Sequence, residues 1–399
     1  MVIAFDTFFL AERFRNVGIY EYAKNLFNEF RRMAAEDSSI DIRYFVSPGY
    51  SEEILASKSS PGFEAVSTQL LGWDRLWRRG LVSYAAMRAR ADLIFSPSPQ
   101  IVPLGLVPVA VTIHDAIPIR LSRHIAGNNR GLRMFTWVAA RMSQRVLTDS
   151  EHSKKDLIEI YNLAPEKVSV VHLGYDQSTF NSAPGNSPAQ ASLLARLGIH
   201  GPYILHHGMV QKRKNLAKLI EAYAILLNRH RDLGYELVLA GPFGFGSEEI
   251  RRMADEGVTQ GKVKFTGPLP AEELAQLIKR ASLCVIPSLY EGFCLPLVEA
   301  MACGVPTIAS NSSCIPEISG GVLRYFDPQS EEEMAATMEV VLEHSDLQRE
   351  LVRNGLKRAS EFNWRRCAQQ TIAALTDFNG RLDLRVSRRS RDDAAIRIQ

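Results

Sequence analysis

The sequence predicts an α/β protein with two doubly wound parallel sheets, one in each of two domains. Short apolar runs alternate with segments long enough for crossover helices, and this alternation occurs in both halves of the chain. Residues 181–188, between the halves, are polar and rich in Pro, Gly and Ser, which is typical of a domain linker. The 399 residues, 46% of them hydrophobic, are enough for two cores.

Six apolar runs in each half are predicted to be buried strands. In the first half they are residues 2–5, 42–46, 93–95, 109–113, 145–147 and 168–171. In the second half they are residues 203–205, 237–240, 263–265, 283–286, 307–309 and 322–325. A helix is expected to open at Gly18, because Tyr22, Leu26 and Phe30 repeat at four-residue spacing.

These elements predict how the chain divides. We expect a first domain over residues 1–185 and a second over residues 186–365. Residues 366–384 are predicted to form a C-terminal helix that packs back on the first domain. Residues 385–399 are rich in arginine and are predicted to be a disordered basic tail.

Composition excludes several classes of protein. A formal charge of +3, from 47 basic and 44 acidic residues, does not indicate a nucleic-acid binder. Five cysteines without a C-x-x-C spacing favour reduced thiols over a disulfide framework or a zinc site. No apolar run approaches the roughly 18 residues needed to span a membrane, and no basic leader precedes one near Met1, so we expect a cytoplasmic protein.

The most informative segment follows the apolar run 283–286. Pro287 ends that run, a loop containing Gly292 follows, and Pro296 stands where a helix would begin. Loop amides over residues 293–295 would lack partners within the helix, so together with the helix dipole they favour an anion such as a phosphate.

Two carboxylates flank this predicted anion site. Glu291 lies in the loop and Glu299 in the first part of the helix. Either one alone could simply complement the helix dipole. As a pair, they suit a ligand that carries phosphate in its middle and hydroxyl groups at both ends.

This segment resembles the signature of the retaining glycosyltransferases of family 4, in which two glutamates stand eight positions apart around E-G-F-G-L-P. Here it reads Glu291-Gly292-Phe293-Cys294-Leu295-Pro296 and continues to Glu299. The resemblance implies that Glu291 holds hydroxyls of the transferred sugar and that Glu299 holds the ribose of a sugar nucleotide. It also implies the GT-B architecture, two Rossmann-like domains facing across a cleft, with the acceptor on the first and the donor on the second.

One position departs from the family pattern. Cys294 replaces the usual glycine, and if the position requires a positive φ, a cysteine costs about 1 kcal/mol there. Gly292, Phe293 and Leu295 match the pattern. With Cys294, they are expected to contact the donor.

In the first domain, two residues after predicted strands are candidates, because ligands of open parallel sheets bind beyond the carboxyl ends of the strands. Gly18 could be an ordinary loop glycine, but the resemblance implies a close approach to donor or acceptor. His114 could be a polar strand end, but the family carries a histidine here that faces the transferred sugar. Asp115 is expected to be structural, and Ser150 is expected to cap a helix.

A basic run opens the second domain. Lys212, Arg213 and Lys214 follow a strand that ends near Gly208, and cations beside a helix N-terminus are unfavourable unless an anion lies between them. A solvated face is the alternative. The resemblance implies that Arg213 and Lys214 bind the pyrophosphate and stabilise the leaving group, with Gly208 beside them.

Two further strand ends complete the expected donor site. Gly241 follows one strand, and Pro268 and Leu269 follow another; the resemblance implies that they wall the nucleobase pocket, although each could be only a turn. No D-x-D motif lies near the donor residues, so we expect no divalent metal and no cofactor beyond the nucleotide sugar.

The resulting hypothesis is a metal-independent retaining hexosyltransferase, with GDP-mannose as the first donor to test and a saccharide or lipid-linked saccharide as acceptor. The mannose expectation rests on residues 213–215 and 311–317, which look similar to bacterial mannosyltransferases of surface polysaccharides. A sugar-nucleotide epimerase or a phosphorylase on the same architecture, and a non-catalytic nucleotide-sugar binder, remain alternatives.

A cluster of arginine and tryptophan lies in the first domain, from Trp73 to Arg90. Arg and Trp interleaved on a helix suit an anionic membrane surface, so a peripheral contact with the inner membrane is one interpretation. The other is that the tryptophans pack inward and the arginines face solvent.

Overall fold

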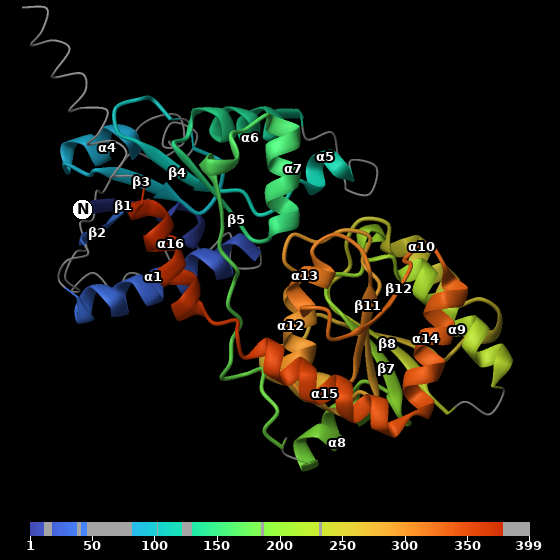
Figure 1. Ribbon diagram of the computed structural model, residues 1–399. Coiled ribbons are helices and arrows are strands. Elements are labelled where there is room, and N and C mark those ends of the chain that lie inside the picture. Colours follow the sequence, from blue (N-terminus) through green and yellow to red (C-terminus); the bar gives the residue numbers. More distant parts are fainter. Residues whose placement is uncertain are drawn as a thin grey trace, which may run out of the picture.

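The computed structural model describes residues 1–11, 18–37, 41–45, 82–101, 103–121, 130–184, 187–230 and 234–377. Two sheets, each covered by helices, form two domains that face each other, and the last helix crosses back to the first domain (Figure 1). The predicted α/β fold with two doubly wound sheets is confirmed.

The first domain is built on a parallel sheet in the order β2-β1-β3-β4-β5-β6. Its strands among the described residues are β1 (Val2–Asp6), β2 (Asp41–Phe45), β3 (Leu93–Ser96), β4 (Val109–Thr112), β5 (Arg145–Thr148) and β6 (Val168–Val170). Each overlaps a predicted apolar run. β3, β4 and β5 are buried along their whole length, as expected for parallel strands covered by helices on both faces.

Helices of the first domain follow the expected pattern. They include α1 (Gly18–Glu36), α4 (Val82–Arg88), α5 (Ile117–Arg120), α6 (Arg130–Met142) and α7 (Glu151–Tyr161). α1 buries Tyr22, Leu26 and Phe30, as their spacing predicts. Ser150 caps α7, because its side chain accepts a hydrogen bond from the backbone N–H of Ser153.

The second domain holds a parallel sheet in the order β12-β11-β10-β7-β8-β9. Its described strands are β7 (Tyr203–His207), β8 (Glu236–Ala240), β9 (Val263–Gly267), β10 (Leu283–Ile286), β11 (Thr307–Ser310) and β12 (Arg324–Phe326). Its described helices are α8 (Ser187–Arg196), α9 (Leu216–Arg229), α10 (Ser247–Ala254), α11 (Ala271–Arg280), α12 (Leu295–Ala302), α13 (Ile315–Ser319), α14 (Glu331–Glu343) and α15 (Ser345–Ala359).

The strand order of the second sheet places its binding crevice. The chain starts at the central strand β7, continues outward to β8 and β9, and then returns to β10 on the other side of β7. The loops after β7 and β10 are therefore neighbours at the carboxyl edge of the sheet, and the chain continues from them toward opposite sides. A crevice at such a switch point is where open α/β sheets bind ligands.

The chain returns to the first domain at its end. Helix α16 (Trp364–Thr376) lies beside α1 (Figure 1). At the start of α16 the chain passes close to Gly174, and a Cβ atom added to Gly174 would lie 2.2 Å from the backbone nitrogen of Trp364. Only glycine leaves room for this crossing.

Two expectations fall on residues that the structure does not describe. The tryptophans and most arginines of the Trp73 to Arg90 cluster lie outside the described residues, as does the tail 385–399. No described helix is both long enough and apolar enough to cross a membrane. All five cysteines are buried and free.

The crossing at Gly174 generates a stability prediction. Gly174→Ala should lower the free energy of unfolding by about 1 to 3 kcal/mol, because the added methyl group meets rigid backbone. Gly131→Ala is the matched control, since Gly131 lies on α6 with nothing within 4 Å of an added Cβ. It should be neutral or slightly stabilising in thermal unfolding, and equal melting temperatures for the two variants would contradict the steric argument.

Candidate active site

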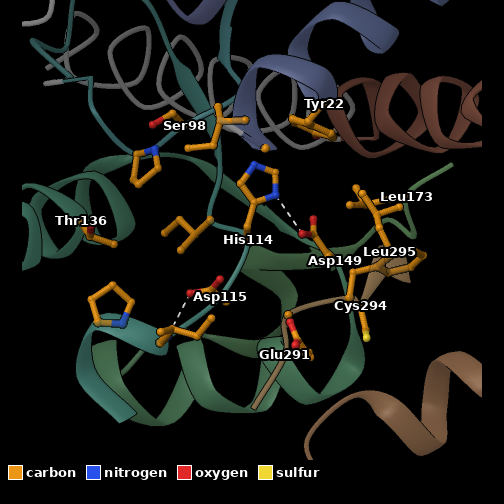
Figure 2. A pocket seen from close by; sticks show the side chains of 18 of the residues that line it. Tyr22, Ser98, His114, Asp115, Thr136, Asp149, Leu173, Glu291, Cys294 and Leu295 are labelled. Atoms are coloured by element: carbon orange, nitrogen blue, oxygen red, sulfur yellow. Dashed lines mark hydrogen bonds and ion pairs between the residues drawn. The ribbon is translucent and has the colours of Figure 1, made fainter. Parts of the chain in front are cut away.

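A pocket of about 480 Å³ lies between the two domains. It is lined from the first domain by the ends of strands and the start of α1, and from the second by the loop after β10 (Figure 2). The predicted site residues that line it are Gly18, His114, Arg213, Glu291, Gly292, Phe293, Cys294 and Leu295.

Three charges form the centre of the second-domain side. Glu291 Oε2 lies 2.7 Å from Arg213 Nη1, and Glu291 Oε1 lies 2.6 Å from Lys214 Nζ. The two cations come from a short 3₁₀ turn after β7, Lys212–Lys214, and Glu291 from the loop after β10. The two cations are far from Glu291 in the sequence, and they meet it because β7 and β10 are neighbours in the sheet.

The two cations control the ionisation of Glu291. Burial alone would raise the pKa of Glu291, but Lys214 and Arg213 outweigh burial and lower it to about 2. Glu291 is therefore a carboxylate at neutral pH. The cluster keeps one net positive charge, because two cations face one anion.

Helix α12 begins beside this cluster. Cys294, at the N-cap, has φ of 71° and ψ of 63°, so the position does require the left-handed conformation that the family's glycine would adopt freely. Cysteine costs about 1 kcal/mol there. Phe293, Cys294 and Leu295 all line the pocket, which places the amino end of α12 at its wall.

At Gly292 the backbone of the second domain passes close to the first domain. A Cβ atom added at Gly292 would lie 2.7 Å from the carbonyl oxygen of His114 and 3.0 Å from Cβ of Asp115. The E-G-F glycine is thus needed for the contact between domains. Asp115 itself accepts a hydrogen bond from the backbone N–H of Ile117 at 2.9 Å, at the start of α5.

His114 lies on the first-domain wall of the pocket. Its Nδ1 is 2.8 Å from Oδ2 of Asp149, and its ring packs perpendicular to that of Tyr22 with centroids 4.7 Å apart (Figure 2). Burial lowers the pKa of His114, but Asp149 outweighs burial, so the pKa is raised above its usual value. The imidazole is held in one orientation by a carboxylate and an aromatic ring.

Three glycines lie side by side where β7, β8 and β9 end. Gly208 donates to the carbonyl of Ala240, and Gly241 donates to that of Gly267. A Cβ atom added at Gly241 would lie 2.1 Å from the carbonyl oxygen of Gly208, so the chain can pass here only as glycine. Pro268 and Leu269 follow directly after β9.

Lys214, Gly208 and Glu299 do not line the pocket themselves. A Cβ atom at Gly208 would lie 3.9 Å from Lys214 Cε and 3.6 Å from Pro296 Cγ, so Gly208 adjoins the charge cluster and the start of α12. Glu299, on α12, lies 3.2 Å from Nε2 of the buried His207. Gly241, Pro268 and Leu269 likewise lie outside the pocket lining.

Sequence reasoning missed the groups that hold the candidates in place. Asp149 orients His114, and Ser313 Oγ accepts the backbone N–H of Glu291 at 2.9 Å. Asp149 follows strand β5, so the rule that sites lie beyond carboxyl ends of strands could have flagged it. No local signal marks Ser313, because its role depends on the loop after β11 lying beside the loop after β10.

Among the described residues, one group could hold a metal ion. His230, Glu339 and Glu343 offer ligand atoms within 4.8 Å of one another, at the end of α9 and on α14. Arg229 also donates to Glu339 at 3.0 Å, and none of the three lines the pocket. This group therefore takes no part in the candidate site.

Two family models match the chain, one in each half. Residues 31–179 match the model described as Glycosyltransferase Family 4, and residues 197–358 match the model described as Glycosyl transferases group 1. The second match contains Gly208, Arg213, Lys214, Glu291 and Glu299.

Curated relatives include bacterial mannosyltransferases and bacterial D-inositol 3-phosphate glycosyltransferases. O-antigen chain mannosyltransferase B of Escherichia coli is 28% identical over 292 residues, 72% of this chain and 75% of the relative. The serotype-specific mannosyltransferase WbdA of Escherichia coli is 29% identical over 267 residues, 66% of this chain but only 32% of that protein. The MMP alpha-(1->4)-mannosyltransferase of Mycolicibacterium hassiacum is 32% identical over 238 residues, 59% of this chain and 54% of that protein.

Solved structures share the fold over nearly the whole chain. Anabaena Alr3699/HepE in complex with UDP and glucose has a TM-score of 0.69 at 19% identity, covering 94% of this chain and 100% of that one. WaaG, a glycosyltransferase involved in lipopolysaccharide biosynthesis, has a TM-score of 0.65 at 16% identity, covering 93% and 98%. The chain therefore contains a domain of the Glycosyltransferase Family 4 model followed by one of the Glycosyl transferases group 1 model, and it has the GT-B fold.

Proposed function

We propose that the enzyme transfers mannose from a nucleoside diphosphate donor, with GDP-mannose first, to a hydroxyl of a saccharide or lipid-linked saccharide. The carrying observation is the buried cluster of Glu291, Arg213 and Lys214 at the switch point of the second sheet, facing His114 across the pocket. Relatives named as O-antigen and serotype-specific mannosyltransferases support the choice of sugar.

The cluster suits departure of a nucleoside diphosphate. When the bond between sugar and phosphate breaks, negative charge develops on the leaving phosphate, and preorganised donors in a water-poor site stabilise it. Arg213, Lys214 and the amides at the start of α12 supply such donors. They make a divalent ion unnecessary for this step, so we propose metal-independent catalysis.

Glu291 is suited to hold hydroxyl groups of the sugar rather than to attack it. Its two oxygens are engaged by cations, and a carboxylate with a pKa of about 2 is weakly basic. We therefore propose that the reaction retains configuration by front-side attack. The leaving phosphate would accept the proton of the acceptor hydroxyl while that hydroxyl forms the new bond.

His114 would complete the site from the opposite domain. Asp149 holds Nδ1, whereas the buried Nε2 makes no hydrogen bond within the described part of the chain, so Nε2 is the ring nitrogen that would bind the sugar. The acceptor would enter on the first-domain side, where Gly18 and Tyr22 line the pocket. In this proposal the second domain binds the nucleotide, and both domains orient the sugar.

A screen of nucleotide sugars tests the proposed donor. In thermal unfolding, GDP-mannose at 100 times its Kd should stabilise the protein by about 2.7 kcal/mol, and mannose should be transferred to a saccharide acceptor. UDP-glucose, UDP-galactose and GDP-fucose serve as comparisons. Stabilisation and transfer with a UDP-sugar in place of GDP-mannose would exclude the proposed donor, and conversion of the donor sugar to an isomer would favour an epimerase.

Substitutions in the two domains should affect nucleotide binding and sugar transfer differently. Glu299→Ala should weaken binding of the bare nucleoside diphosphate about 10-fold or more, because the ribose loses a charged hydrogen-bond partner. His114→Ala should lower kcat while leaving that Kd nearly unchanged, since His114 lies in the other domain. Isothermal titration and initial rates measure both quantities. Equal loss of nucleotide affinity in both variants would refute this assignment.

The leaving-group role of Lys214 can be separated from that of a nearby lysine. Lys214→Ala should lower kcat about 100-fold or more, the effect typical of losing one preorganised donor. Lys218→Ala is the matched control, because Lys218 forms ion pairs with Glu221 and Glu331 at the surface. Its rate should stay near that of the wild type, and EDTA should not reduce activity. A requirement for added Mg²⁺ or Mn²⁺ would contradict the proposal.

A further inference from the structure

A carboxylate of the second domain covers the amino end of a first-domain helix. Glu317, on α13, accepts hydrogen bonds from the backbone N–H groups of Glu151 at 2.8 Å and His152 at 3.1 Å, in the first turn of α7. It also lies 3.1 Å from Nε2 of His172. First-turn amides have no partner within their own helix, so here the other domain satisfies them.

The loop that carries Glu291 touches the same helix. Tyr290 Oη donates to Oδ2 of Asp156 on α7 at 2.5 Å, and Ser153 Oγ lies 3.5 Å from the carbonyl oxygen of Gly292. Asp156 is held in turn by Nε of Arg120 at 2.9 Å. The residues on both sides of Glu291 therefore contact α7.

Both contacts are mechanically linked to Glu291. Arg213 Nη1 donates to the carbonyl oxygen of Tyr290 at 2.7 Å, so Tyr290 is bound by one residue from each domain. On the other side, Ser313 accepts the backbone N–H of Glu291 and stands four residues before Glu317. Arg358 fixes α13 from the second domain by donating to the carbonyl oxygen of Glu317 at 2.9 Å.

We propose that Glu317 and Tyr290 are positioning residues. Their hydrogen bonds to α7, here called the lock, hold the cleft closed and thereby keep the loop of Glu291 next to His114. Neither touches the reacting atoms. Their effect on transfer rests on the proposed function, whereas the lock itself is a property of the fold.

The chemistry of these contacts suits a lock that opens and closes. All of them are hydrogen bonds, and water can replace either partner when the cleft opens. Glu317 gains two amides with partial positive charge at a helix N-terminus, so closure is favoured without burying an unpaired charge. Alignment of the Glu291 loop is then coupled to closure, because the same α7 receives both contacts.

Hydrogen exchange tests the lock without any assay of activity. In the full-length protein, the amides of Glu151 and His152 should exchange slowly, although first-turn amides of a capped helix ordinarily exchange fast. Glu317→Ala should speed their exchange at least about tenfold, and Glu317→Gln less, because one acceptor oxygen remains. If both amides exchange in the wild type as fast as in Glu317→Ala, the lock is absent and the proposal is overturned.

Kinetics tests whether the lock positions Glu291. Tyr290→Phe and Glu317→Ala should each lower kcat about 10-fold while leaving the Kd for GDP within about twofold, because the nucleotide-binding residues are untouched. Tyr223→Phe is the matched control, since it removes a buried hydroxyl that donates to the carbonyl of Tyr235 within the second domain at 2.7 Å. It should keep the wild-type kcat, even if it lowers the melting temperature as much as Tyr290→Phe does.

Failure of the positioning role can be distinguished from failure of the proposed function. A wild-type enzyme that transfers sugar, with Tyr290→Phe and Glu317→Ala equally fast, overturns the positioning role and leaves the proposed function standing. A wild type that transfers nothing from any donor refutes the proposed function, and the exchange of Glu151 and His152 then decides the lock alone.

Discussion

The buried ion cluster of Glu291 with Arg213 and Lys214 constrains the rest of the second domain. A carboxylate buried to this degree is costly unless cations meet it in good geometry, and removing one partner from such a group typically costs about 3 to 5 kcal/mol. Lys214 and Glu291 lie 77 residues apart along the chain and can meet only because β7 and β10 are neighbours. The strand order that forms the crevice also assembles its charges.

The sequence was sufficient for the fold because parallel, fully covered strands are continuous apolar runs. All twelve predicted runs became strands, with ends shifted by two residues at most. It was also sufficient to place His114, Arg213 and Glu291 around one pocket, because each follows a strand that the pattern located. The partners of these residues come from other loops, Asp149 for His114 and Ser313 for Glu291, and only Asp149, directly after β5, had a signal in the sequence.

Cys294 shows how a local rule is broken at the site. Its φ of 71° is unfavourable for a residue with a side chain, and a free choice would place glycine there. The conformation is nevertheless needed, because it turns the chain from the loop of Glu291 into α12 within a single residue. Burial also raises the pKa of the Cys294 thiol to about 12, so the side chain is an uncharged filler beside the charge cluster rather than a nucleophile.

The contacts around the cleft differ in kind. Beside the crossing to α16, the packing is aromatic: Phe293 meets Phe362 edge to face with centroids 5.4 Å apart, and His172 lies 6.0 Å from Phe293. Apolar packing of this kind gains nothing from water, so it favours staying closed. At α7 the contacts are hydrogen bonds, which water can replace. Opening the cleft at α7 therefore exchanges hydrogen bonds within the protein for hydrogen bonds to water, whereas separating His172 from Phe293 would expose apolar surface.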